Sequence, residues 1–217
     1  MKYFNIILVF SVSFFLFGTS FAGNCPSVKN PQGIKTVDPY QLDLPDYEKQ
    51  LGRKLSLNEN PMFAKQVNAG NLPPVSDRIP TEALIYLPYD NCGKYGGMLR
   101  GLSKALESGT SEILSWRHVN LVRLSDDLQT LVPNVAKSWK WNDDFSSLTM
   151  SLRKGHKWAD GVPFTTDDVV FYIDDIIKNK DLHSVVPSNW MVGGKPVEVT
   201  KINAQTFRFD FAAPYPG

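Results

Sequence analysis

Histidine and cysteine are scarce in this chain, which has three histidines and two cysteines among its 217 residues. The histidines, His118, His156 and His183, are far apart, and neither cysteine has a second ligand at metal-binding spacing. A Gly-x-Ser-x-Gly turn, which would present a nucleophilic serine, is also missing. The sequence therefore predicts no metal, no cofactor and no enzymatic activity.

Long apolar runs are absent except at the N-terminus. The run from Phe4 to Phe17 follows Lys2 and precedes small residues at Ser20 and Ala22. This order is typical of a secretory signal peptide over residues 1–22, cleaved after Ala22. A membrane anchor is the alternative, but the run has about 14 residues where a spanning helix needs about 20. We therefore expect an exported, periplasmic protein.

Neither sign of charge is in excess. The chain has 23 lysines and arginines against 22 aspartates and glutamates, a formal net charge of +1. Cleavage after Ala22 removes the charge of Lys2 and makes the mature chain neutral. A neutral chain lacks the basic footprint of a nucleic-acid-binding protein and the polybasic patch of a membrane-surface protein. We expect a monomer whose partners are a small-molecule or peptide ligand and other proteins, with no nucleic acid.

The two cysteines leave three readings open. Export to an oxidising compartment makes a disulfide between Cys25 and Cys92 plausible, and it would tie down the N-terminal region. Two separate thiols are the second reading. Lipidation of Cys25 is the third, although Ala22-Gly23-Asn24 before it does not match the pattern expected there.

The composition changes along the mature chain. Residues 23–92 are rich in proline, asparagine and charge, and predict an extension with short helices over 45–54 and 60–68. Residues 93–217 predict a denser domain with strands over 95–101, 121–124, 148–152, 197–202 and 205–211. The last two form a hairpin through Asn203-Ala204, with Phe207, Phe209 and Phe211 on one face.

Residues 131–178 hold the clearest local signals. We expect a helical turn from Pro133 to Trp139, a turn at 142–144, and a second turn at Asp160-Gly161. Thr165 and Asp168 form a capping-box pattern at the start of a helix. Its buried stripe is Val169, Ile173, Ile176 and Ile177. Trp139, Trp141, Trp158 and Phe164 are expected to pack as core rather than to contact a ligand.

These segments resemble a known family. The sequences "VPNVAKSW" and "LTMSLRKGHKWADGVPFTTDDVVF" are similar to the signature of the family-5 extracellular solute-binding proteins, the binding components of bacterial peptide and nickel ABC importers. The flanking "NLPPVSDRIP", "KYGGMLRG" and "PVEVTKINAQTFRFDFAAPYP" resemble that family in register. The resemblance covers the chain from about residue 60 onward.

The resemblance implies an α/β fold of the type II periplasmic-binding-protein kind. Family members have two lobes that close around a ligand at a hinge, and an extra subdomain on the first lobe. Because members are much longer, it also implies that this chain is a fragment holding the first lobe and its subdomain, truncated before the second lobe. The implied function is capture of oligopeptides or a related solute for a membrane permease.

The resemblance places candidate ligand contacts in the loop after the first strand, at Ser108, Gly109 and Thr110, with Tyr95 and Trp116 as further candidates. An ordinary surface loop is the alternative for this segment. Two other functions stay open for the whole protein. One is a secreted hydrolase with its catalytic residues elsewhere, and the other is an envelope protein that binds partners without transport.

Overall fold

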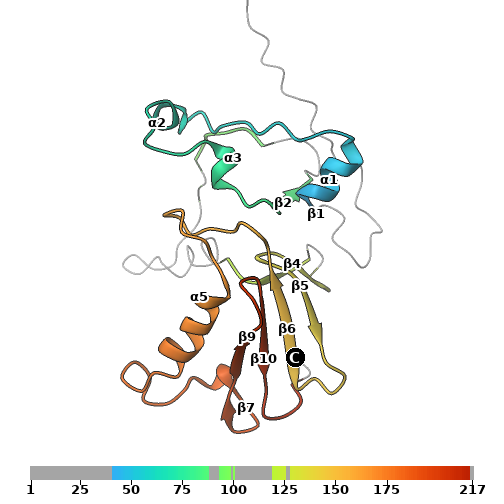
Figure 1. Ribbon diagram of the computed structural model, residues 1–217, viewed down its shortest axis with the longest axis vertical. Coiled ribbons are helices and arrows are strands. Elements are labelled where there is room, and N and C mark those ends of the chain that lie inside the picture. The colour runs from blue at the N-terminus through green and yellow to red at the C-terminus, as the bar shows by residue number, and fades with distance from the viewer. Residues whose placement is uncertain (1–40, 88–92, 99, 101–118, 126–127, 216–217) are drawn as a thin grey trace, which may run out of the picture.

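A four-stranded antiparallel sheet with one helix on one face is the centre of the molecule (Figure 1). The computed structural model describes residues 41–87, 93–98, 100, 119–125 and 128–215. The sheet has the strand order β5-β6-β10-β9, formed by Ala136–Trp141, Ser147–Leu152, Thr206–Asp210 and Glu198–Lys201. The predicted signal peptide and both cysteines, Cys25 and Cys92, lie outside the described residues.

Alternation in the two central strands decides which face of the sheet is buried. Phe207 pairs with Met150 and Phe209 with Leu148, so the apolar side chains of β6 and β10 share one face. Their neighbours Thr149, Ser151, Thr206 and Arg208 lie on the other face, which is polar. The period of two therefore produces a sheet with one apolar and one polar side.

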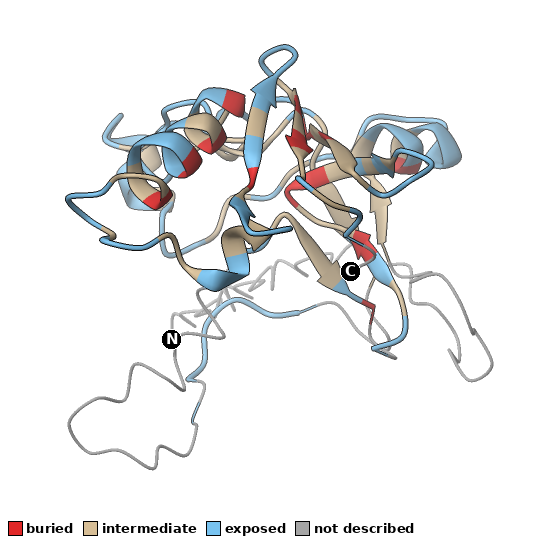
Figure 2. Cartoon of the chain, turned by 90° about the horizontal axis from the view of Figure 1, so that it is seen from below, coloured by how far each residue is buried: buried red, intermediate tan, exposed pale blue. Residues whose placement is uncertain are grey.

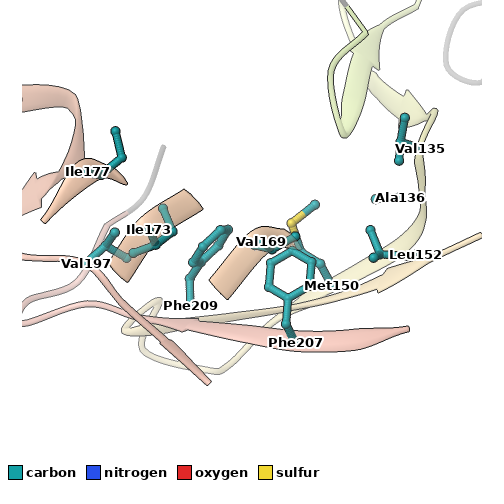
Figure 3. Packing of buried hydrophobic residues seen from close by; sticks show 10 residues of the cluster. All are labelled: Val135, Ala136, Met150, Leu152, Val169, Ile173, Ile177, Val197, Phe207 and Phe209. Atoms are coloured by element: carbon teal, nitrogen blue, oxygen red, sulfur yellow. The ribbon is translucent and has the colours of Figure 1, made fainter. Parts of the chain in front are cut away.

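The helix α5 (Thr166–Phe171) continues as a π-helix, η1 (Tyr172–Ile177), and covers the apolar face. Val169, Ile173 and Ile177 are buried and belong to the same apolar cluster as Phe207 and Phe209 (Figure 3). The remaining members of the cluster come from the strands and from the segments just before β5 and β9. They are Val135, Ala136, Met150, Leu152 and Val197.

The sequence predicted the helix and three residues of its buried stripe correctly, whereas Ile176 is only half-buried and lies outside the buried cluster; the helix type also changes. The amide of Lys178 donates to the carbonyl of Ile173, a step of five residues that defines a π-helical turn. Two buried positions four residues apart, Ile173 and Ile177, suit either kind of turn. Side-chain periodicity therefore does not reveal the wider backbone spacing.

Two predictions about 93–139 are wrong within the described residues. Positions 93–98 and 100 form no strand, because Gly96 and Gly97 have φ values of 99° and 84° and no strand lies beside them in the described chain. The expected helical turn from Pro133 to Trp139 is extended instead. Pro133 ends strand β4 (Leu131–Pro133), which pairs with β3 (Val122–Leu124), and Trp139 pairs with Met150 in β5–β6.

The N-terminal region lies at one end of the sheet (Figure 1). It contains β1 (Gln41–Asp43), α1 (Leu44–Leu51), α2 (Ala64–Asn68), α3 (Val75–Arg78) and β2 (Leu84–Tyr86). Strands β1 and β2 pair with each other in an antiparallel ladder. The first predicted helix is confirmed and stops at Gly52, which takes the left-handed conformation with φ 66°.

Smaller elements complete the chain. A 3-10 turn, η2 (Ser188–Trp190), leads into a two-stranded ribbon of β7 (Met191–Val192) and β8 (Lys195–Pro196). The predicted strand 148–152 and the hairpin of β9 and β10 are both confirmed. Among the described residues, no helix has the length and apolar character needed to span a bilayer.

Candidate functional site

The predicted ligand contacts are only partly covered by the structure. Ser108, Gly109, Thr110 and Trp116 lie outside the described residues. Tyr95 is described, and 60% of it is exposed on a segment without regular secondary structure. An exposed aromatic ring is available to a ligand, so the exposure of Tyr95 leaves its predicted role open.

Asp167 and Asp168, two neighbouring carboxylates, lie in the first turn of helix α5. The hydroxyl of Thr165 accepts a bond from the Asp167 amide at 3.2 Å, and the Asp168 carboxylate accepts one from the Thr165 amide at 2.7 Å. The indole of Trp158 donates to the other oxygen of Asp168 at 3.0 Å. The predicted capping box is confirmed, and Asp168 is fully engaged in structure rather than placed for acid–base chemistry.

The second pair of neighbouring carboxylates lies further along the helix. Asp174 and Asp175 are exposed. Asp174 accepts a bond from Lys178 at 2.9 Å, and the same ammonium reaches Glu198 on β9 at 2.5 Å. Burial opposes charge on Lys178, but these two carboxylates outweigh it and raise the lysine pKa. Through Lys178, Asp174 and Glu198 therefore connect the helix to β9.

The histidines form no site in the described chain. His156 is half-buried, with its ring edge-on to Phe164 at 5.6 Å between centroids. Burial, followed by the nearby positive charge of Arg153, lowers the pKa of His156. His183 lies far along the chain, and His118 is outside the described residues. No group of three histidine, cysteine or carboxylate side chains suited to a metal ion occurs among the residues that the structure describes.

An aromatic pocket of about 200 Å³ lies at one edge of the core. It is lined by Trp141, Leu148, Asn189, Trp190, Val192, Val197, Phe209, Phe211 and Tyr215. The ring centroids of Trp141 and Phe211 are 5.6 Å apart, and the ring planes are tilted by 30°. The lining has no charged group, so it offers no counter-ion to the termini of a peptide.

The four aromatic residues predicted as core do not behave alike. Trp139 and Phe164 pack against the buried cluster, as expected. Trp141 is half-buried and lines the aromatic pocket. Trp158 is 51% exposed, because the turn at Asp160-Gly161 leaves its ring on the surface, with Phe164 and Asp168 as its neighbours. For Trp158 the prediction of a core position is wrong.

A cluster of charged side chains lies where the N-terminal region meets the sheet. Arg153, which is 3% exposed, pairs with Asp43 and also donates to the Glu82 carbonyl at 3.1 Å and the Asn134 carbonyl at 2.5 Å. Lys137 reaches Glu82 at 2.9 Å and Asp43 at 3.6 Å. Nothing in the sequence pattern singles out these charges.

Two groups of this region have shifted pKa values that follow from their contacts. Burial disfavours the charged form of Glu82, but bonds from the Lys154 amide and the Lys137 ammonium outweigh it and lower the carboxyl pKa. The hydrogen bond to Glu82 raises the pKa of Lys137. Both groups are therefore held in their charged forms, which suits a structural connection better than proton transfer.

The fold is that of part of a bacterial solute-binding protein. A solved oligopeptide-binding protein, OppA, is 35% identical and superposes with a TM-score of 0.70, covering 80% of this chain and 27% of that one. MelB from Agrobacterium fabrum C58, solved with stachyose, is 31% identical with a TM-score of 0.56, covering 75% of this chain and 28% of that one. These similarities confirm the predicted α/β periplasmic-binding-protein fold.

Sequence comparison points to the same class of protein. Residues 130–217 match the family model of the bacterial extracellular solute-binding proteins, family 5, in its middle region. The periplasmic alpha-galactoside-binding protein of Rhizobium meliloti (strain 1021) is 31% identical over 173 residues, which is 70% of this chain and 25% of that protein. The chain thus spans about a quarter of the length of the relatives that it matches.

Proposed function

We propose that the complete protein is the extracytoplasmic substrate-binding component of an ABC importer. The observation that carries the proposal is the family-5 match over residues 130–217, together with relatives at 31% and 35% identity that are themselves binding proteins. In this role a ligand favours a closed arrangement of two lobes, and the closed form delivers it to the membrane permease. Since the relatives are binding proteins, the proposal includes no catalysis.

The division of the chain follows from the same proposal. Residues 1–22 would be the signal peptide, 23–92 an extension, and 93–217 part of the solute-binding domain, in a monomer that works in the periplasm. Ser108, Gly109 and Thr110 would present backbone amides to the ligand, with Tyr95 and Trp116 as aromatic contacts. The exposure of Tyr95, at 60%, is compatible with such a contact.

The relatives suggest two candidate classes of ligand. OppA is named for oligopeptides, whereas the Rhizobium meliloti protein is named for alpha-galactosides and MelB was solved with stachyose. We infer an oligopeptide or a related small solute as the general class. An alpha-galactoside oligosaccharide is the second candidate, supported by these two relatives.

The test is a ligand panel on the complete purified protein. Its melting temperature is followed with mixed tri- to pentapeptides, with stachyose and other alpha-galactosides, and with nickel–histidine. A ligand at about 100 times its dissociation constant stabilises the folded state by about 2.7 kcal/mol, which moves the melting temperature by several degrees. No shift with any ligand would contradict the transport role and favour an envelope interaction protein. Turnover of a panel compound would favour the hydrolase.

A further inference from the structure

The N-terminal region is attached to the sheet without sharing its hydrophobic core. We call residues 41–86 the strap. Tyr47 is its only buried residue, at 9% exposure. No strap residue belongs to the hydrophobic cluster or to the apolar side chains packed against it. Burial therefore concentrates in the sheet and helix, as the buried positions in Figure 2 show.

The strap is instead connected to the sheet by polar contacts. The central ones join Arg153 to Asp43 and Lys137 to Glu82. The others involve main-chain and side-chain groups along the same seam. Around Lys154, its carbonyl accepts from the Glu82 amide at 3.3 Å and the Thr81 hydroxyl at 3.0 Å, and its amide donates to the Glu82 carboxylate at 3.0 Å. Around Gln41, its side-chain amide donates to the Pro133 carbonyl at 3.1 Å, and Arg123 donates to the Gln41 side chain at 2.8 Å and to the Tyr86 hydroxyl. Lys157 donates to the Asp77 carbonyl.

The strap also holds itself together without the sheet. Strands β1 and β2 pair over three residues each, and the Leu44 amide donates to the Ala83 carbonyl at 2.8 Å. At the far end, Arg78 pairs with Glu59 at 2.5 Å, which joins α3 to the segment before α2. The strap therefore has internal contacts that can survive separation from the sheet.

Arg153 is the centre of the seam, and its bonding is incomplete. Its side chain is 3% exposed, and the Nη2 atom has no hydrogen-bond partner within the described part of the chain. A buried guanidinium is costly to desolvate, and an unmade bond leaves part of that cost uncompensated. Such a pair fixes one register of docking more than it adds stability.

We propose that the strap is a separate opening unit, fastened to the sheet by the Arg153–Asp43 and Lys137–Glu82 pairs, which detaches while the sheet and helix stay folded. The basis is the contrast between a seam of polar contacts and a core in which Phe207 and Ile173 are completely buried. Segments with few buried apolar contacts open at lower free energy than the core to which they are attached. Detachment exposes the end of the sheet around Lys137 and Arg153.

Hydrogen exchange of the complete protein, resolved by mass spectrometry into peptides, tests this proposal. We expect the β1–β2 amides to exchange through an opening that leaves the β6 and β10 amides protected. Lys137→Met and Glu82→Gln should each speed exchange of the strap by about two- to fivefold, with β6 and β10 unchanged. The double variant should show less than the product of the two effects, because each change removes the same pair.

A matched control uses an ion pair away from the seam. Lys178→Met removes the contacts to Asp174 and Glu198 and should leave exchange of the strap unchanged. The proposal is overturned if strap and core amides open together with one free energy in the unmodified protein. It is also overturned if the Lys137 and Glu82 variants speed both regions equally, or if their effects multiply independently.

Discussion

Truncation of Phe207 to alanine should damage the core more than any other change to this hairpin. The ring is 0% exposed, pairs across β6 with Met150, and lies 5.0 Å from the Phe209 ring in an edge-on arrangement. The change removes both the apolar burial and the aromatic contact, and leaves a cavity that a sheet cannot readily close. Losses of this kind in buried phenylalanines are about 3–5 kcal/mol.

This loss of stability can be measured in strands β6 and β10 themselves. Because each 1.36 kcal/mol is about tenfold, the opening constant of the β6 and β10 amides should rise between roughly 100-fold and several thousandfold. Native-state hydrogen exchange in low urea gives this constant directly for the peptides over 147–152 and 206–210. If the alanine variant does not fold, Phe207→Leu should still fold and show a smaller loss, about 1–2 kcal/mol.

Phe171→Ala is the matched control, since the same residue type stands there with 57% exposure on the outer side of the helix. Substitutions at such positions usually change stability by less than about 0.5 kcal/mol. Equal effects at Phe207 and Phe171 would refute the assignment of the core to this face of the sheet. So would a loss below about 1 kcal/mol in the folded Phe207→Ala protein.

Three further changes test other parts of the structure. Thr165→Ala removes the helix cap and should cost about 1 kcal/mol in urea unfolding, whereas Thr165→Ser should retain most of it; equal losses would contradict the capping role. Gly155→Ala should lower the free energy of unfolding by more than about 1 kcal/mol and speed exchange of the strap. The reason is that Gly155 has a φ of +78° and an added Cβ would lie 2.8 Å from the Thr81 amide nitrogen. An unchanged melting temperature would exclude that close approach. His156 should make the protein less stable as the pH falls below roughly 6.5, because burial and Arg153 lower its pKa in the folded state and the unfolded chain then binds the proton first. His156→Gln should flatten the slope of the melting temperature between about pH 7 and pH 5, and an unchanged slope would assign the dependence to other groups.

Features that depend on neighbouring residues were predictable from the sequence. The cap at Thr165 with Asp168 three residues later, the alternation of Leu148, Met150 and Leu152, and the aromatic hairpin all appear in the structure. Each is specified by a period or a turn within a few residues. The helix expected over 45–54 is also present, but it ends at Leu51, because Gly52 takes the left-handed conformation directly after the last turn.

The segment from Pro133 to Trp139 shows where local signals fail. A proline that precedes a segment of mixed apolar and polar residues favours a helical turn. In the structure, however, Pro133 is the last residue of β4, and the next strand, β5, begins at Ala136. The pairing of Trp139 with Met150 decides the outcome, with a shift in register between Ala136 and Ser138. A bulge of this kind depends on the partner strand, so tertiary pairing overrides the local preference.

The strap marks a different limit. Arg153 and Asp43 are 110 positions apart in the sequence. Arg153 is one of 23 lysines and arginines, and Asp43 is one of 22 aspartates and glutamates. Their spacing carries no period, and burial, which gives the pair its importance, belongs to the folded chain alone. In a protein with balanced and interspersed charges, the charges that matter are those that folding removes from water. Arg153 is 3% exposed and its Nη2 has no hydrogen-bond partner among the described residues, which directs attention to this seam more strongly than any motif does.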